Sequence, residues 1–216
     1  MKRLLTAVVF TFLLPTVMFS QDSPDRILFF GDSITAGYGV GEDQAFPAFI
    51  QQKIDSAGLA YKAINGGSSG ETSAGGLRRI DWVLQQPVSV FVLELGGNDG
   101  LRGIDLDATK QNLQKIIDKV ESKYPEAEII ITGMQVPPNL GPEYTQQFKE
   151  MYPELAKANG VKLIPYFLDD LGGDSELMQS DGIHPTKKGH KLLAKKVWEV
   201  LRPILEDRNR DSHTNE

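Results

Sequence analysis

Strand-like segments alternate with segments of helical spacing along most of this chain. The predicted strands are four to eight residues long and mostly apolar, and they lie at 27–30, 61–65, 88–95, 128–132 and 161–164. Between them, apolar residues recur every three or four positions, which predicts helices near 44–57, 77–84, 113–120, 143–159 and 186–205. This alternation is typical of a parallel sheet covered on both faces. We therefore predict an α/β fold, a three-layer α/β/α sandwich around five parallel strands.

The N-terminal residues 1–20 differ in kind from the rest. Lys2 and Arg3 precede an apolar run from Leu4 to Phe19, which is the layout of a secretory signal peptide. We expect cleavage near Ser20 and export to the periplasm or beyond, with an uncleaved anchor as the alternative. The run is short for a membrane span of roughly 20 residues. After cleavage we expect no stable membrane span.

The rest of the chain is expected to form one domain over residues 21–206. A chain of 216 residues with 40% hydrophobic residues can bury one core, and without cysteine that core must suffice without disulfides. Residues 207–216 are all polar and are expected to form a disordered tail. The formal charge is −6, and removing Lys2 and Arg3 takes it to −8. An acidic chain without a basic cluster is not expected to bind nucleic acid.

A turn that carries a serine follows the first apolar run. Gly31 can take positive φ, and Asp32 and Ser33 are residue types that cap helices. The carboxyl ends of parallel strands meet at one edge, where ligands and catalytic groups collect. Ser33 is therefore a candidate nucleophile. The simpler interpretation is that Ser33 caps the next helix and takes no part in chemistry.

The far end of the chain supplies the base and the acid that such a nucleophile needs. Asp181 lies three residues before His184, and Pro185 stiffens the turn. A serine hydroxyl needs a neutral imidazole to take its proton and a carboxylate to orient that imidazole. His190 falls among lysines in a helical segment and is expected to be solvated, and His213 lies in the polar tail. His184 is therefore the strongest candidate for a base.

Four segments, taken in order, resemble the four blocks of the SGNH (GDSL-type) hydrolases: 31–33, the glycine-rich loop 65–73, 96–99 and 181–185. The run 94–103 is similar, more narrowly, to the bacterial thioesterase I, lysophospholipase L1 and arylesterase branch. The resemblance implies a flavodoxin-like strand order 2-1-3-4-5. It also implies ester hydrolysis through an acyl-enzyme, with Ser33, His184 and Asp181 as the triad.

The same resemblance implies an oxyanion hole. Its donors would be the backbone N–H of Ser33, the backbone N–H of Gly70 and the side-chain amide of Asn98. Glycine lets a backbone approach a substrate closely, and an amide donates without acting as a base. Asp32 and Asp99 are the carboxylates most easily confused with the acid of the triad. We expect both to accept hydrogen bonds from backbone N–H groups.

Ser68 is a rival nucleophile, because residues 66–70 match the Gly-x-Ser-x-Gly pattern of the α/β-hydrolases. That fold places several strands before its nucleophile, and this chain is short for the usual sheet. We therefore favour Ser33 over Ser68.

The substrate class is suggested by apolar residues near the site. By resemblance, residues 100–105 correspond to a mobile loop that closes over acyl chains, and glycines at its ends suit a lid. The predicted substrate-binding residues are Leu101, Ile104, Val136, Met178 and Ile183. We expect a small-molecule acyl ester such as a lysophospholipid, a short-chain ester or an aryl ester. Thioesters also fit, but acyl-CoA is cytoplasmic and would not meet an exported enzyme.

Two other function classes stay open. A carbohydrate O-acetyl esterase would use the same triad, but Trp82 and Trp198 fall in predicted helices and offer no stacking platform. A non-catalytic flavodoxin-like module could bind phosphate at the glycine-rich loop, although no Walker pattern is present. One usable histidine and no cysteine make a poor metal-ligand set. We expect no metal, no cofactor and a monomer.

Overall fold

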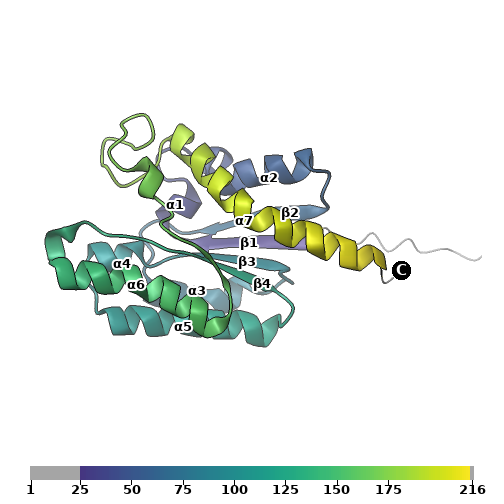
Figure 1. The fold of residues 1–216 in the computed structure, drawn as a ribbon, viewed down its shortest axis with the longest axis horizontal. Helices are drawn as coiled ribbons and strands as arrows, with labels where there is room; N and C mark the ends of the chain where they lie inside the picture. The colour runs from purple at the N-terminus through teal and green to yellow at the C-terminus, as the bar shows by residue number, and fades with distance from the viewer. Residues whose placement is uncertain (1–24, 215–216) are drawn as a thin grey trace, which may run out of the picture.

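A computed structural model describes residues 25–214 and places a parallel sheet between two layers of helices (Figure 1). The strands are β1 (Asp25–Gly31), β2 (Tyr61–Gly67), β3 (Val90–Glu94), β4 (Glu128–Thr132) and β5 (Lys162–Ile164). Their order is β2-β1-β3-β4-β5, and each neighbouring pair is parallel. The predicted sandwich and the strand order 2-1-3-4-5 are therefore confirmed.

Helices connect the strands as the sequence pattern predicts. The longer helices are α2 (Phe46–Ser56), α3 (Ser73–Val83), α5 (Leu106–Lys123), α6 (Pro142–Asn159) and α7 (Lys187–Thr214). Two short helices, α1 (Ser33–Ala36) and α4 (Gly97–Leu101), follow β1 and β3 directly. Three single turns of 3₁₀ helix complete the order: η1 (Glu42–Gln44), η2 (Pro138–Leu140) and η3 (Asp169–Leu171). The short elements are too brief to produce a helical period in the sequence.

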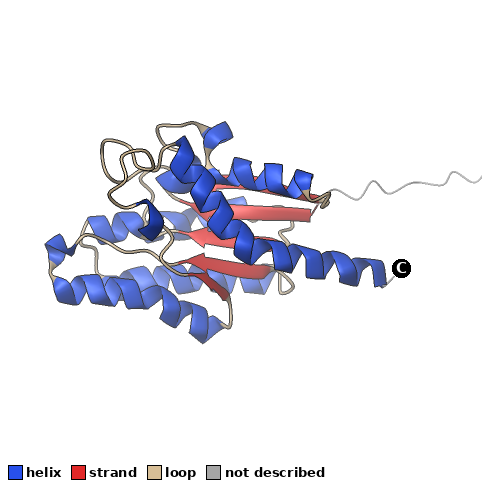
Figure 2. Ribbon diagram, turned by 45° about the horizontal axis from the view of Figure 1, so that its top comes forward, coloured by secondary structure: helices blue, strands red, loops and turns tan. Residues whose placement is uncertain are grey.

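The central strands contribute side chains to an apolar core on each face of the sheet. In β1, Leu28 and Phe30 pack in the core shared with α3, α5 and α6, whereas Ile27 and Phe29 pack in the core shared with α2 and α7. Figure 2 shows these two helical layers on either side of the strands. Burial on both faces explains why consecutive positions in these strands are apolar.

The strands all end at the same edge of the sheet, as the arrows in Figure 2 show. The loops after β1, β2 and β3 therefore open on that edge, together with the segment that leads into α7. Residues far apart in the sequence can meet there.

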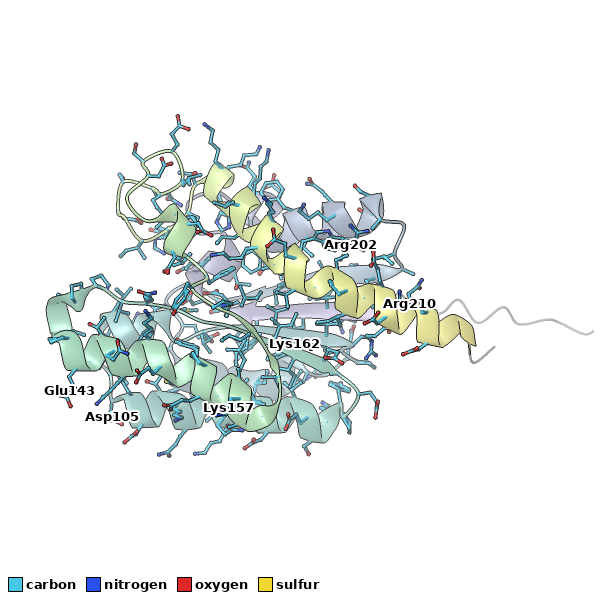
Figure 3. The ribbon with its side chains drawn as sticks, viewed as in Figure 1. Asp105, Glu143, Lys157, Lys162, Arg202 and Arg210 are labelled. Carbon is cyan, nitrogen blue, oxygen red and sulfur yellow. The ribbon has the colours of Figure 1, made fainter. Side chains whose placement is uncertain are left out.

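Charged side chains lie on the outer surfaces of the covering helices. Figure 3 labels Glu143 and Lys157 on α6, and Arg202 and Arg210 on α7, all of them exposed. Among the helices of residues 25–214, none combines the length and the apolar character needed to cross a bilayer. The predicted signal peptide, residues 1–20, lies outside the described part of the chain.

The C-terminal tail differs from the prediction. Residues 207–214 continue α7 as helix, so the expectation of a disordered tail over 207–216 was wrong for them. Arg208 contributes to this extension, because its Nη1 donates to the backbone oxygen of Glu126 at 2.8 Å. A polar composition predicted disorder, but a helix already nucleated by the buried residues up to Leu205 can continue without an apolar face of its own.

His190 also differs from the prediction, because it is fully buried rather than solvated. Its Nδ1 accepts a hydrogen bond from Phe46 N at 3.2 Å, and burial lowers its pKa to about 4. The residue lies on the inward face of α7 with Leu193 and Val197, while the neighbouring lysines face away. Its role is to join α7 to the start of α2.

Candidate active site

Ser33 is the first residue of α1 and follows the buried end of β1. Asp32 caps this helix, since its Oδ1 accepts a hydrogen bond from the backbone N–H two residues on, at 3.0 Å. Gly31 is required by close packing and not by positive φ: a Cβ there would lie 2.1 Å from Thr35 Oγ1 and 2.5 Å from Glu94 O. The turn therefore places Ser33 at the edge of the sheet, and close packing around Gly31 holds the turn in position.

A second buried carboxyl lies beneath this turn. Glu94, the last residue of β3, is fully buried, and its Oε2 accepts hydrogen bonds from Thr35 Oγ1 at 2.6 Å and Thr35 N at 3.2 Å. Burial, with the neighbouring charge of Asp32, raises the pKa of Glu94 well above its ordinary value. Burial also raises the pKa of Asp32 to about 6, against the opposite effect of its hydrogen bonds. Two carboxyl groups thus brace the turn that carries Ser33.

The segment between η3 and α7 carries Asp181 and His184. Asp181 Oδ1 accepts hydrogen bonds from the backbone N–H of Ile183 at 2.9 Å and of His184 at 3.0 Å. Its Oδ2 lies 2.7 Å from His184 Nδ1. These hydrogen bonds, led by that from the His184 backbone, lower the pKa of Asp181 to about 2. The carboxylate therefore stays charged and holds a proton on Nδ1 of the imidazole.

The two segments meet at Ser33. His184 Nε2 lies 2.9 Å from Ser33 Oγ, although the residues are 151 positions apart in the chain. With Nδ1 protonated, Nε2 is the acceptor that faces the serine hydroxyl. The ring of Tyr38 packs against the imidazole with 4.5 Å between the ring centroids. The structure thus brings Ser33, His184 and Asp181 into one hydrogen-bonded row.

Gly70 and Asn98 belong to two further loops at this edge. Asn98, in α4, lines the cavity beside Ser33, and its Nδ2 donates to Asp32 Oδ2 at 3.2 Å. Gly70, after β2, has a φ of +78°, and its carbonyl accepts a hydrogen bond from Arg102 Nη2 at 3.1 Å. Gly70 is exposed and is not among the residues that line the cavity. Of these two predicted donors, Asn98 is the one that the structure places at the cavity wall.

Asp99 is buried and links α3 to the loop after β3. Its Oδ2 accepts a hydrogen bond from Ser73 N at 2.8 Å, and its Oδ1 accepts from Ser73 Oγ at 2.5 Å and from Thr109 Oγ1 at 3.3 Å. The expectation that Asp32 and Asp99 bond backbone N–H groups is confirmed. The partner of Asp99, however, is the start of α3 and not its own loop.

An apolar cavity of about 280 Å³ opens beside Ser33 and His184. Ile104, predicted to help line it, does not: its N–H donates to Asp99 O at 3.0 Å and its carbonyl accepts from Tyr144 at 2.8 Å. These bonds tie the backbone of Ile104 to α4 and to α6, and its side chain is not part of the cavity wall. The other four predicted substrate-binding residues do line the cavity: Leu101, Val136, Met178 and Ile183.

Other features of the surface do not resemble a substrate site. A larger hollow of about 870 Å³ lies at the opposite edge of the sheet and is lined largely by charged side chains of α5, α7 and the strand starts. Neither Trp82 nor Trp198 lines the cavity beside Ser33, and Trp82 is 70% exposed on α3. Within residues 25–214, no group of three or more acidic or histidine side chains could hold a metal ion.

The model of the GDSL-like lipase/acylhydrolase family matches residues 29–192, which include all the residues assembled at this edge. This chain belongs to that family. It is 38% identical over 186 residues to the esterase TesA of Pseudomonas aeruginosa, an alignment that covers 86% of this chain and 92% of that protein. It is 36% identical over 195 residues to thioesterase 1/protease 1/lysophospholipase L1 of Escherichia coli K12, with 90% of each chain covered.

Solved structures of family members have the same fold as this GDSL-family chain. The crystal structure of TesA superposes with a TM-score of 0.79 at 38% identity, covering 83% of this chain and 99% of that one. The psychrotrophic esterase EstA from Pseudoalteromonas sp., inhibited by monoethylphosphonate, also gives 0.79 at 32% identity, with 84% and 99% covered. A third relative, the arylesterase of Vibrio mimicus, is 34% identical over 202 residues, with 93% of this chain and 98% of that protein covered. The predicted resemblance to the thioesterase, lysophospholipase and arylesterase branch is confirmed by these relatives.

Four residues of the site were not predicted from the sequence: Thr35, Tyr38, Glu94 and Arg102. A charged residue that ends a strand buried on both faces is a usable signal, and Glu94 carries it. The contacts of the other three residues depend on which loops meet at the sheet edge, and no local pattern of the sequence reports that.

Proposed function

We propose that the protein is a serine esterase whose triad is Ser33, His184 and Asp181. The observation that carries this proposal is the unbroken row of hydrogen bonds from Ser33 Oγ through both ring nitrogens of His184 to the charged carboxylate of Asp181. In a family of acylhydrolases, such a row next to an apolar cavity supports acyl transfer to the serine.

The first half of the proposed reaction forms an acyl-enzyme. Ser33 Oγ attacks the ester carbonyl carbon while His184 Nε2 takes the hydroxyl proton, and Asp181 stabilises the imidazolium that results. The negative charge on the former carbonyl oxygen accepts hydrogen bonds from Ser33 N–H, Gly70 N–H and Asn98 Nδ2. When the tetrahedral intermediate collapses, the C–O bond to the leaving group breaks and His184 gives its proton to the leaving oxygen, which departs as the alcohol.

The second half of the reaction returns the enzyme to its starting state. A water molecule attacks the acyl-enzyme while His184 Nε2 takes one of its protons. Collapse of this intermediate breaks the bond to Ser33 Oγ, which regains a proton from His184 and releases the carboxylic acid. A thioester can follow the same steps: the C–S bond breaks, His184 gives its proton to the leaving sulfur, and a thiol departs in place of the alcohol.

The cavity supports a substrate with a short to medium acyl chain. Its walls are mostly apolar, from Leu101, Val136, Met178 and Ile183, and its volume of about 280 Å³ suits a chain of limited length. Relatives are named arylesterase and lysophospholipase L1, and we extend both ester classes to this protein. We propose further that residues 100–105 act as the lid, with Leu101 at its cavity side.

We also propose that the enzyme acts outside the cytoplasm as a monomer. The layout of residues 1–20 supports export, and cleavage near Ser20 would release the catalytic domain. The mass of the mature protein recovered from a periplasmic extract tests cleavage, and its elution on a sizing column tests the oligomeric state.

Paired serine variants test the assignment of the nucleophile. Ser33→Ala should abolish hydrolysis of p-nitrophenyl esters, whereas Ser68→Ala should keep near wild-type kcat and KM. Full activity in Ser33→Ala would refute the proposed triad. A series of acyl chain lengths, with lysophosphatidylcholine alongside, then identifies the substrate class.

A further inference from the structure

One side chain joins the two loops that carry the proposed oxyanion donors. Arg102 caps the C-terminus of α4, four residues after Asn98. Its Nη2 donates to Gly70 O at 3.1 Å and to Asn98 Oδ1 at 3.2 Å. Gly70 follows β2 and Asn98 follows β3. Arg102 Nη2 therefore connects two loops whose bonded residues are 28 positions apart in the sequence.

Arg102 also determines which end of the Asn98 amide faces the reaction. A guanidinium can only donate, so it bonds the amide oxygen Oδ1. The carboxylate of Asp32 accepts from the other end, Nδ2, at 3.2 Å. With a donor on one side and an acceptor on the other, the amide is held with its N–H₂ group toward Asp32 and the cavity. A rotated amide would put an oxygen where a donor is needed.

The Gly70 end of this bridge needs an external support. Gly70 is exposed and lies at a φ of +78°, and the peptide that carries its carbonyl is bonded only within the loop, from Glu71 N–H to Ser68 O at 3.1 Å, apart from the contact with Arg102. On the other side of this loop, Glu71 is held by an ion pair with Arg79, whose Nη2 also donates to Gly66 O at 2.9 Å. Arg102 provides the matching contact at Gly70 itself.

The charge of Arg102 is available to the site. None of the ion pairs found among residues 25–214 includes Arg102, and its guanidinium donates to two neutral oxygens, Gly70 O and Asn98 Oδ1. A cation hydrogen-bonded to Asn98 Oδ1 strengthens the polarisation of the Nδ2 donor in the same amide. At Gly70 the bonded carbonyl belongs to the peptide that follows the N–H donor, so this contact fixes the position of the loop.

We propose that Arg102 is a positioning residue of the oxyanion hole, which holds the loop at Gly70 in place and the Asn98 amide in the orientation that receives the developing negative charge. This inference rests on the proposed function. In this role Arg102 affects turnover through the two donors and does not itself contact the reacting atoms.

Arg102→Gln tests this role, with Arg78→Gln as the matched control. Arg78 is an exposed arginine on α3, outside the site. Removing a whole oxyanion donor costs about 10²–10³ in rate, so loosening two donors should lower kcat about tenfold and leave KM within about twofold. The control should match wild type. A change in KM alone, or an unchanged kcat, would overturn the inference.

A double-mutant cycle separates positioning from general damage. If Arg102 acts partly through Asn98, Arg102→Gln should cost clearly less in kcat when Asn98 is already alanine than in the wild-type background. Equal fold losses in the two backgrounds would contradict the proposal. Ser33→Ala, measured in parallel, keeps the two claims apart. An inactive Ser33→Ala with a fully active Arg102→Gln refutes only the role of Arg102, whereas an active Ser33→Ala refutes the proposed function.

Discussion

The two segments that meet at the Ser33–His184 hydrogen bond hold their aspartates in opposite environments. Asp32, beside Ser33, is 3% exposed, and burial raises its pKa to about 6. Asp181, beside His184, has 38% of its side chain exposed, and hydrogen bonds from His184 and Ile183 lower its pKa to about 2. The nucleophile side is fixed by tertiary packing, and the base side by hydrogen bonds within four residues.

This difference explains why the two carboxyl groups have different roles. The acid of a triad must stay ionised while the imidazole gains and loses a proton, and Asp181 meets that condition. Asp32 becomes protonated near pH 6 and is better suited to cap α1 and to accept from Asn98. Placing the nucleophile requires a rigid core, whereas orienting the base requires only a short, well-bonded turn.

The largest effect is expected from a substitution in the segment that carries His184. Asp181→Asn should lower kcat about 10⁴-fold, because the imidazole loses the carboxylate that selects its tautomer. Asp99→Asn should lower turnover much less and mainly reduce stability, since Asp99 bonds Ser73 and Thr109. Turnover of a p-nitrophenyl ester and thermal unfolding measure the two effects. A larger loss of kcat in Asp99→Asn would remove Asp181 from the triad.

The next largest effect is expected from a substitution that weakens the packing beneath Ser33. Glu94→Ala leaves the two donors of Thr35 unpaired in the core, so it should cost about 2–4 kcal/mol of unfolding free energy. Turnover should fall about tenfold or more as Ser33 loses its fixed position. Glu94→Gln is the matched control. An amide has the shape of the carboxyl and preserves the acceptor for Thr35, and it resembles the neutral form that the raised pKa of Glu94 favours.

In this comparison, a fall in kcat for Glu94→Gln as large as for Glu94→Ala would show that an ionised Glu94 is required. That result would contradict the account of the buried pair. Urea unfolding and kcat, measured on the same preparations, separate a loss of stability from a loss of positioning.

The pH dependence of stability sharpens the contrast between the two aspartates. The folded pKa of Asp32, about 6, lies above its unfolded value of 3.8, so the folded chain binds more protons between these values and stability falls as pH rises. Over that window wild type should lose about 3 kcal/mol more unfolding free energy than Asp32→Asn does. Asp181 has the opposite sign: its contribution is present above pH 3.8 and is lost as pH falls toward 2.

Urea unfolding from pH 4 to pH 7 measures this difference directly. Curves for wild type and Asp32→Asn that stay parallel across the window would contradict the buried environment assigned to Asp32.

The smallest expected effect lies away from both segments. His190→Ala removes the acceptor of Phe46 N and should cost about 1–3 kcal/mol of stability while kcat stays within about twofold. His190→Asn keeps an acceptor near the same place and should recover part of that stability. A large loss of kcat at full stability would give His190 a part in the chemistry, contrary to its place between α2 and α7.

The fold was predictable because its strands and its helices each have a distinct pattern of apolar residues in the sequence. Strands such as β4 are apolar at consecutive positions, and helices such as α5 repeat every three to four residues. The candidate triad was predictable because its parts lie in short motifs. The burial of His190 could also have been predicted, since positions 190, 193, 197 and 201 form one helical face. The prediction that it is solvated relied instead on the neighbouring lysines, which lie on the other face of the helix.

What the sequence could not predict depends on contacts between loops. Thr35 meets Glu94, and Arg102 meets Gly70, only after β1, β2 and β3 are side by side. Ile104 was expected at the cavity because it is apolar and close to Leu101, yet its backbone hydrogen bonds draw it elsewhere. Such placements follow from the folded sheet edge and leave no periodic signal.

Covalent labelling with a fluorophosphonate tests the central claim most directly, because only an activated serine displaces the fluoride. Digestion and mass spectrometry of the labelled wild-type protein should find the adduct on the peptide that contains Ser33, and His184→Ala should prevent labelling. An adduct on Ser68, or labelling that survives the loss of His184, would contradict the account.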